Sequence, residues 1–120
     1  MSTNQVQKGD TIQFTAAGAL ASGAVVPLQH CVGIAMAAAA GAGALIPLAL
    51  EGVFTVPKAA GTAWVVGEKL VWDASANAFA TTAVVLAAGD LTGVAIVAAP
   101  AASGDVVGVA KLTPGNAARQ

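Results

Sequence analysis

The feature that most constrains the fold is a turn signal that recurs along the chain. A glycine followed directly by an acidic residue occurs four times, at Gly9-Asp10, Gly67-Glu68, Gly89-Asp90 and Gly104-Asp105. Each pair is followed within one or two residues by a β-branched residue or a leucine. Glycine adopts positive φ without steric cost, and aspartate hydrogen-bonds the backbone of its own turn. Short apolar runs separated by turns about every ten residues predict an all-β sandwich or barrel.

The segments between these signals have the composition of short strands. The predicted strands are Thr11–Thr15, Val25–Leu28, His30–Ala37, Ala44–Val56, Trp64–Val66, Lys69–Asp73, Ala78–Thr82, Leu91–Val97 and Val106–Leu112. The alternative is that alanine runs such as Ala37–Ala40 are helical, because alanine is the best helix former. Gly41 and Gly43 would limit such a helix to about one turn. We therefore predict a small, single-domain, jelly-roll-like β-sandwich or barrel over residues 11–113, with a polar N-terminal arm (1–10) and a C-terminal tail (114–120).

An internal echo indicates that one hairpin is used twice. Residues 32–39 (VGIAMAAA) resemble residues 92–99 (TGVAIVAA). A few positions later, residues 44–49 (ALIPLA) align with residues 105–110 (DVVGVA), with one residue inserted in the second loop. Two hairpins in pseudo-equivalent places suit a closed barrel or a two-sheet sandwich.

The composition is apolar, but its side chains are small. Hydrophobic residues make up 57% of the chain, including 31 alanines and 16 valines, whereas charged residues make up 9%. A free soluble domain usually has about 25% charged residues, and a net charge as small as −1 favours association. Two interpretations remain: a neutral surface around an alanine-rich core, or an exterior covered by partners or by copies of the chain. The composition excludes disorder, and five Lys+Arg against six Asp+Glu leave no basic patch for nucleic acid.

A membrane interpretation is disfavoured although no charge lies between Asp10 and Glu51. The uncharged residues 31–50 could reach across a bilayer as a helix, yet they include three glycines and a proline and are otherwise mostly alanine, which adds little to insertion. The N-terminal residues lack the apolar segment of a signal peptide. We expect no membrane partner and synthesis and folding in the cytoplasm, which also fits the lone Cys31.

The sequence offers few residues for catalysis. His30 and Cys31 are adjacent, and neighbours on a strand point to opposite faces, so a Cys–His nucleophile pair is disfavoured. Residues 61–69 lack the Gly-Lys-Ser/Thr core of a phosphate-binding loop. Most carboxylates already have an explanation in turns, namely Asp10, Asp73, Asp90 and Asp105. We predict no enzyme and assign no catalytic, cofactor-binding or metal-ligating residue.

Candidate contact residues come from the arm and from isolated positions. The polar arm could add a strand to the sheet edge of a neighbouring subunit, and we expect contacts with other subunits to hold both chain ends. Glu51 lies in the longest apolar run and either faces solvent or forms a salt bridge across a subunit interface. Trp64, like Trp72, is either a core residue or an interface anchor. The candidate contacts are Ser2, Thr3, Asn4, Gln5, Val6, Gln7, Glu51, Trp64 and Arg119.

Several stretches resemble a protein family found in tailed phages, the small capsid cement or head decoration proteins. The resemblance begins at residues 3–10 (TNQVQKGD) and is most telling in residues 50–58 (LEGVFTVPK) and 67–73 (GEKLVWD). Residues 32–35 (VGIA) and 91–95 (LTGVA) add to it. Members of the family sometimes carry a label linking them to RecA-type recombinases, but this sequence has no Walker motif to support such an activity.

The resemblance implies a structural protein of the virion with no active site. Such a protein sits on the outer surface of the phage head and bridges neighbouring major capsid subunits, so its expected partners are the major capsid protein and copies of itself, as dimers or trimers. Many modest contacts on a symmetric shell add up to tight attachment. Alternatives are another virion component, such as a tail, spike or head-fibre protein, or a small ligand-binding β-barrel.

Overall fold

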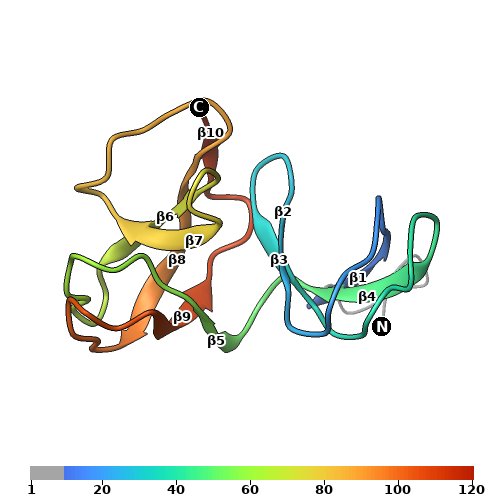
Figure 1. Cartoon of the computed structure of the whole chain (residues 1–120), viewed down its shortest axis with the longest axis horizontal. Coiled ribbons are helices and arrows are strands. Elements are labelled where there is room, and N and C mark those ends of the chain that lie inside the picture. Colours follow the sequence, from blue (N-terminus) through green and yellow to red (C-terminus); the bar gives the residue numbers. More distant parts are fainter. Residues whose placement is uncertain (1–9) are drawn as a thin grey trace, which may run out of the picture.

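The computed structural model describes residues 10–120, and the fold is all-β over that range (Figure 1). Its strands are β1 (Thr11–Thr15), β2 (Val25–Pro27), β3 (Val32–Ala35), β4 (Leu45–Ala49), β5 (Val53–Pro57), β6 (Lys69–Asp73), β7 (Ala78–Thr81), β8 (Leu91–Ala99), β9 (Val107–Leu112) and β10 (Ala118–Arg119). The described residues form no helix, so the predicted all-β class is confirmed and the helical alternative for the alanine runs is wrong. Across residues 10–120 no helical segment has the length and hydropathy needed to span a bilayer.

The first half of the chain forms a four-stranded antiparallel sheet in the order β1-β4-β3-β2. Gly33 of β3 leaves room for a neighbouring strand's side chain. A Cβ at this position would lie 2.4 Å from Cγ of Leu48, which is fully buried on β4. The small residue on β3 is therefore matched to the large residue across the sheet.

The second half forms a six-stranded sheet in the order β5-β9-β8-β6-β7, with β10 added beside β8. The sheet curls until its two edge strands touch. Lys58, just after β5, bridges to Phe79 of β7, and the amide of Ala59 donates to the carbonyl of Phe79 at 2.8 Å. This half is therefore close to a small barrel.

The two sheets lie side by side and share one core (Figure 1). Val32, Ile34 and Ala49 of the four-stranded sheet belong to the same buried cluster as the side chains that fill the curled sheet. The largest of those are Trp64, Trp72, Phe79, Leu70 and Leu91. Both tryptophans are therefore core residues, and Trp72 packs edge-on against Phe79 at a centroid distance of 5.3 Å.

The internal echo corresponds to two antiparallel hairpins, β3–β4 and β8–β9, as predicted. Their registers differ. Ala35 pairs with Leu48, whereas Ala95, its equivalent, pairs with Leu112 and not with the aligned Val109. The second hairpin has thus slid by three residues (112 − 109). The longer β8 also contains irregular register against both β6 and β9.

Three predicted strands need correction. Ala44–Val56 is two strands in different sheets, because the chain turns at Gly52, whose φ of 125° is in a region that favours glycine. Trp64–Val66 forms one isolated bridge, from Trp64 to Ala101, before the chain turns. Of the predicted strand His30–Ala37, only Val32–Ala35 forms a strand. The other strands agree with prediction to within one or two residues at their ends.

The C-terminal segment is held by its own chain, and its expected contacts with other subunits stay a prediction. The hydroxyl of Thr113 donates to the carbonyl of Gly93 at 2.8 Å, and β10 pairs with β8. The segment also reaches the β2–β3 loop, where the amide of Ala117 donates to the carbonyl of His30 at 3.2 Å. It therefore joins the two sheets.

Candidate functional site

The predicted contact residues lie in different places. Glu51 is exposed in the loop between the two sheets and does not lie on a strand. Trp64 is 2% exposed and lies in the core, so its ring offers no surface to a partner in the single chain. Arg119 is exposed on β10 and its guanidinium donates to the carbonyl of Leu28 at 2.7 Å. The candidates Ser2, Thr3, Asn4, Gln5, Val6 and Gln7 lie outside the described residues.

Sequence reasoning missed Lys58, which is 3% exposed. Its Nζ donates to the carbonyls of Ala59, Ser103 and Asp105 at 3.2–3.5 Å and lies 5.8 Å from the centroid of the Trp64 ring. This ammonium fastens the end of β5 to the β8–β9 loop. The pattern "VPK" placed a lysine after a strand, but nothing local in the sequence indicated that the side chain turns inward.

The predicted role of the acidic turn residues is confirmed at three sites. Glu68, Asp90 and Asp105 each accept a hydrogen bond from the amide three residues earlier, at 3.4, 2.9 and 2.9 Å. In each case the acidic residue's own amide donates back to the carbonyl of that earlier residue. Asp90 is the buried one, at 1% exposed, and its second oxygen also accepts from the amide of Ala74. These carboxylates hold the backbone.

His30 and Cys31 lie in the β2–β3 loop. His30 is exposed, and Cys31 is partly buried, which raises the pKa of its thiol; a backbone hydrogen bond with Gly115 acts in the opposite direction. Within residues 10–120, His, Cys, Asp and Glu side chains do not gather in the groups of three or more that could hold a metal ion.

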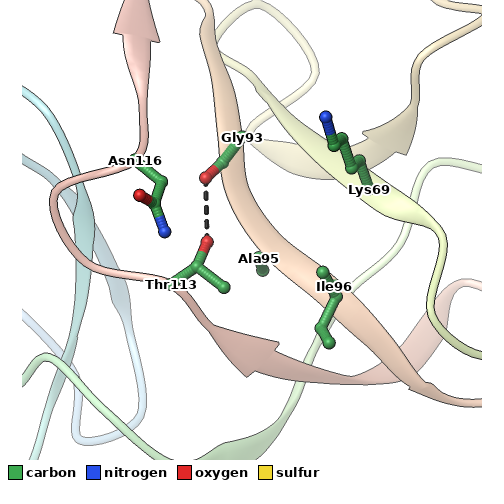
Figure 2. A pocket seen from close by; sticks show the side chains of 6 residues that line it. All are labelled: Lys69, Gly93, Ala95, Ile96, Thr113 and Asn116. Atoms are coloured by element: carbon green, nitrogen blue, oxygen red, sulfur yellow. Dashed lines mark hydrogen bonds between the residues drawn. The ribbon is translucent and has the colours of Figure 1, made fainter.

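Two adjoining hollows lie beside the C-terminal segment. The first, of about 350 Å³, lies between β6, β8 and residues 113–116, with Lys69 and Asn116 on its opposite sides (Figure 2). The second, of about 400 Å³, has Glu51 and Lys111 in its lining and shares Thr113 and Asn116 with the first. The few polar groups of both hollows come from the strands and turns that also shape the six-stranded sheet and its C-terminal segment.

Apolar side chains are exposed at the outer ends of the six-stranded sheet. Val65 and Val66 follow Trp64, Val106 directly precedes β9 and Val107 begins it; all four are more than half exposed. The Trp64–Ala101 bridge joins the first of these segments to the β8–β9 loop, which leads to the second. A second exposed apolar segment, in the β7–β8 loop, contains Val85 and Leu86, at 89% and 44% exposed.

The four-stranded sheet has one covered face and one partly open face. On the covered face, Ala35 and Ile46 pack with Ala16 and Ala39 from the adjoining loops. On the other face, the end near Val32 and Ile34 joins the main core. The far end of that face, which we call the open face, consists of Gln13, Thr15, Met36, Leu45 and Pro47, all exposed.

The charge is distributed unevenly between the two sheets. Residues 11–50, which contain all of the four-stranded sheet, include no Asp, Glu, Lys or Arg. Among residues 10–120 the exposed charges therefore lie at Asp10 and from Glu51 onward. A domain without charged residues over a third of its length is unusual, since soluble domains have about 25% charged residues.

The fold and these surfaces define a small all-β protein with extensive uncharged, apolar exterior. A family model described as phage cement protein matches residues 6–112. The chain belongs to this family, which confirms the resemblance noted in its sequence, and it is a capsid-associated virion protein with a structural role. Neither the curated proteins nor the solved structures yield a significant match to the chain.

Proposed function

We propose that the protein binds the outside of a phage head and bridges neighbouring major capsid subunits, and that copies of the chain meet one another on the shell. It acts through surface contact and catalyses no reaction. The observation that carries this proposal is the family match over residues 6–112. The protein is made in the cytoplasm of the host bacterium and attaches to the shell there.

The surface chemistry supports attachment to other proteins. Exposed valines and leucines occur on both halves of the molecule, including Leu45, Val65, Val85 and Val106. Apolar area removed from water contributes about 25 cal/mol per Å² to association. A repeated shell multiplies such modest contacts, so that overall attachment exceeds the affinity of any one of them.

Gradient co-sedimentation with expanded heads stripped of decoration tests the proposal. We expect saturable binding at a fixed ratio to the major capsid protein, and coated heads that survive heating better than bare heads. Absence of binding to the cognate heads contradicts the proposal. The protein would then be sought in the tail.

Glu51 and Arg119 are proposed contacts on the shell or between subunits, and Glu51 allows a matched experiment. Its carboxylate is exposed at the junction of the two sheets, next to Lys111 in the lining of the hollow there. Glu51→Lys should weaken head binding, whereas Glu68→Lys, which makes the same charge change in a turn of the six-stranded half, should not. Equal head binding by both variants would remove Glu51 from the contact.

The arm is a further proposed contact. Removing residues 2–7, which include Ser2, Thr3 and Gln7, should lower the affinity for heads if the arm adds a strand to a neighbour. Full binding by the truncated chain would show that the arm is dispensable.

A further inference from the structure

We propose that the open face of the four-stranded sheet is the surface through which two copies of this chain contact each other. This inference rests on the part of the proposed function in which copies meet, and it names the residues involved. The occupant of the face is the same face on a second copy.

Strand register places the residues of the open face side by side. Gln13 pairs with Pro47, and Thr15 pairs with Leu45. The amide of Met36 donates to the carbonyl of Pro47 at 3.0 Å, which puts Met36 in the same row. Since side chains alternate between faces along a strand, these five residues point to the same side of the sheet.

Three of the five residues of the open face, Met36, Leu45 and Pro47, are apolar, although an exposed sheet face is normally polar. Met36 is 50% and Leu45 is 64% exposed. An antiparallel sheet with one solvated face usually places polar side chains there. Here the covered face is already packed by Ala16, Ala35, Ala39 and Ile46, so the open face is the side left for another sheet to cover.

The absence of charge favours a second copy over a different protein. In a contact around a symmetry axis, the same surface patch faces itself, so each charged residue near the axis meets a like charge. Like charges brought together cost several kcal/mol of association free energy. A different protein can place an opposite charge against a charged residue of this face, so binding to a different protein does not disfavour charged residues there. Residues 11–50 include no Asp, Glu, Lys or Arg at all, so this part of the chain places no charged side chain where it would meet its own copy.

Sedimentation velocity of the full chain, from micromolar to hundreds of micromolar, tests the inference. We expect the wild type to form a dimer or higher oligomer. Leu45→Glu should raise its dissociation constant about a hundredfold, because the carboxylate is both buried and brought near its own copy. Leu86→Glu is the matched control, with the same substitution on the other half of the molecule, and should leave the oligomer unchanged.

A milder variant protects the test against misfolding. Gln13→Glu changes an exposed polar residue to one of nearly the same shape, so folding should be unaffected. It should weaken the oligomer, and high salt should restore much of the association because about 1 M salt reduces the screening length to about 3 Å. Circular dichroism spectra of all variants should match the wild type.

The outcomes separate this inference from the proposed function. A wild type that stays monomeric overturns the inference, as does an oligomer that Leu45→Glu and Gln13→Glu leave intact or that Leu86→Glu disrupts equally. Head binding is measured in parallel with the wild type. Head binding without self-association overturns the inference and leaves shell attachment standing. Self-association without head binding overturns shell attachment and leaves the inference standing.

Discussion

One close fit between two residues in the core is that of Gly108 against the Trp64 ring. A Cβ at Gly108 would lie 2.5 Å from Cζ3 and 2.7 Å from Cε3 of the indole, which is 2% exposed and held in place by the core. Glycine is therefore required at this position for its small size, since its φ is not in the left-handed region.

Gly108→Ala should destabilise the protein by about 1–3 kcal/mol, because overpacking a filled core displaces side chains. Gly104→Ala is the control, since a Cβ there meets no atom within 4 Å. That change should be neutral or stabilise the protein by up to about 1 kcal/mol by restricting the unfolded chain. Urea unfolding measures both, and equal midpoints would contradict this account of Gly108.

The thiol of Cys31 should react slowly in the folded protein. Burial raises its pKa, so less of the reactive thiolate is present at a given pH than in the unfolded chain. Alkylation by iodoacetamide near pH 8 should therefore be faster after denaturation in urea. The same shift favours the folded state below the unfolded thiol pKa, and this contribution is lost as the pH rises through the folded pKa. A folded-state rate equal to the denatured rate would contradict the shift.

At the scale of the element, one type of turn is used repeatedly. Gly67 and Gly89, with φ of 87° and 92°, precede acidic residues whose carboxylates and amides close the turn. Gly23 and Gly43 also have φ of 87°. In their turns the amide of the following alanine donates to the carbonyl three residues earlier, and no carboxylate contact is described there. The recurrence of this turn explains why the sequence pattern located the strands.

Buried and exposed versions of this turn should differ in their contribution to stability. Asp90→Ala removes a buried carboxylate that accepts from the amides of Ala74 and Ala87, and the part-buried amides lose this acceptor, at an expected cost of about 1–3 kcal/mol. Asp105→Ala removes one hydrogen bond, to Ala102, at an exposed turn and should cost less than about 1 kcal/mol. Thermal unfolding compares them, and similar costs would show that burial of Asp90 is unimportant.

The C-terminal segment, residues 113–120, links the two sheets, and we call it the clasp. Removing residues 118–120 deletes β10, the guanidinium contact with Leu28 and the pairing of Gln120 with Gly89 and Asp90. We expect a loss of about 1–3 kcal/mol and faster hydrogen exchange at Gly89, whose amide loses its acceptor. Arg119→Ala deletes only an exposed contact and should cost less than about 1 kcal/mol. Unchanged exchange after truncation would mean that the clasp is not formed in solution.

At the scale of the whole molecule, the shared core predicts cooperative unfolding. Trp64 and Trp72 both lie in the six-stranded half, so their fluorescence follows that half, whereas far-ultraviolet circular dichroism follows both sheets. Because Val32, Ile34 and Ala49 belong to the same cluster as the tryptophans, the two signals should give one coincident transition in urea. An earlier circular dichroism transition would mean that the four-stranded sheet unfolds by itself.

The sequence by itself determined the features that depend on neighbouring residues. Glycine and acidic residues indicated the turns, short apolar runs between them indicated most strands, and the lack of charge over residues 11–50 was visible directly. The paired hairpins were also predictable, because their repeated segments are local.

The tertiary structure decided the features that join distant parts of the chain. The break at Gly52 sends β4 and β5 into different sheets, and Lys58 turns inward to carbonyls 45 and 47 residues away. The three-residue slide of the second hairpin, the clasp from Arg119 to Leu28 and the open face likewise depend on which strands become neighbours. Such pairings arise from the free energy of burying a common core, to which distant segments contribute together, and so no single stretch of sequence contains them.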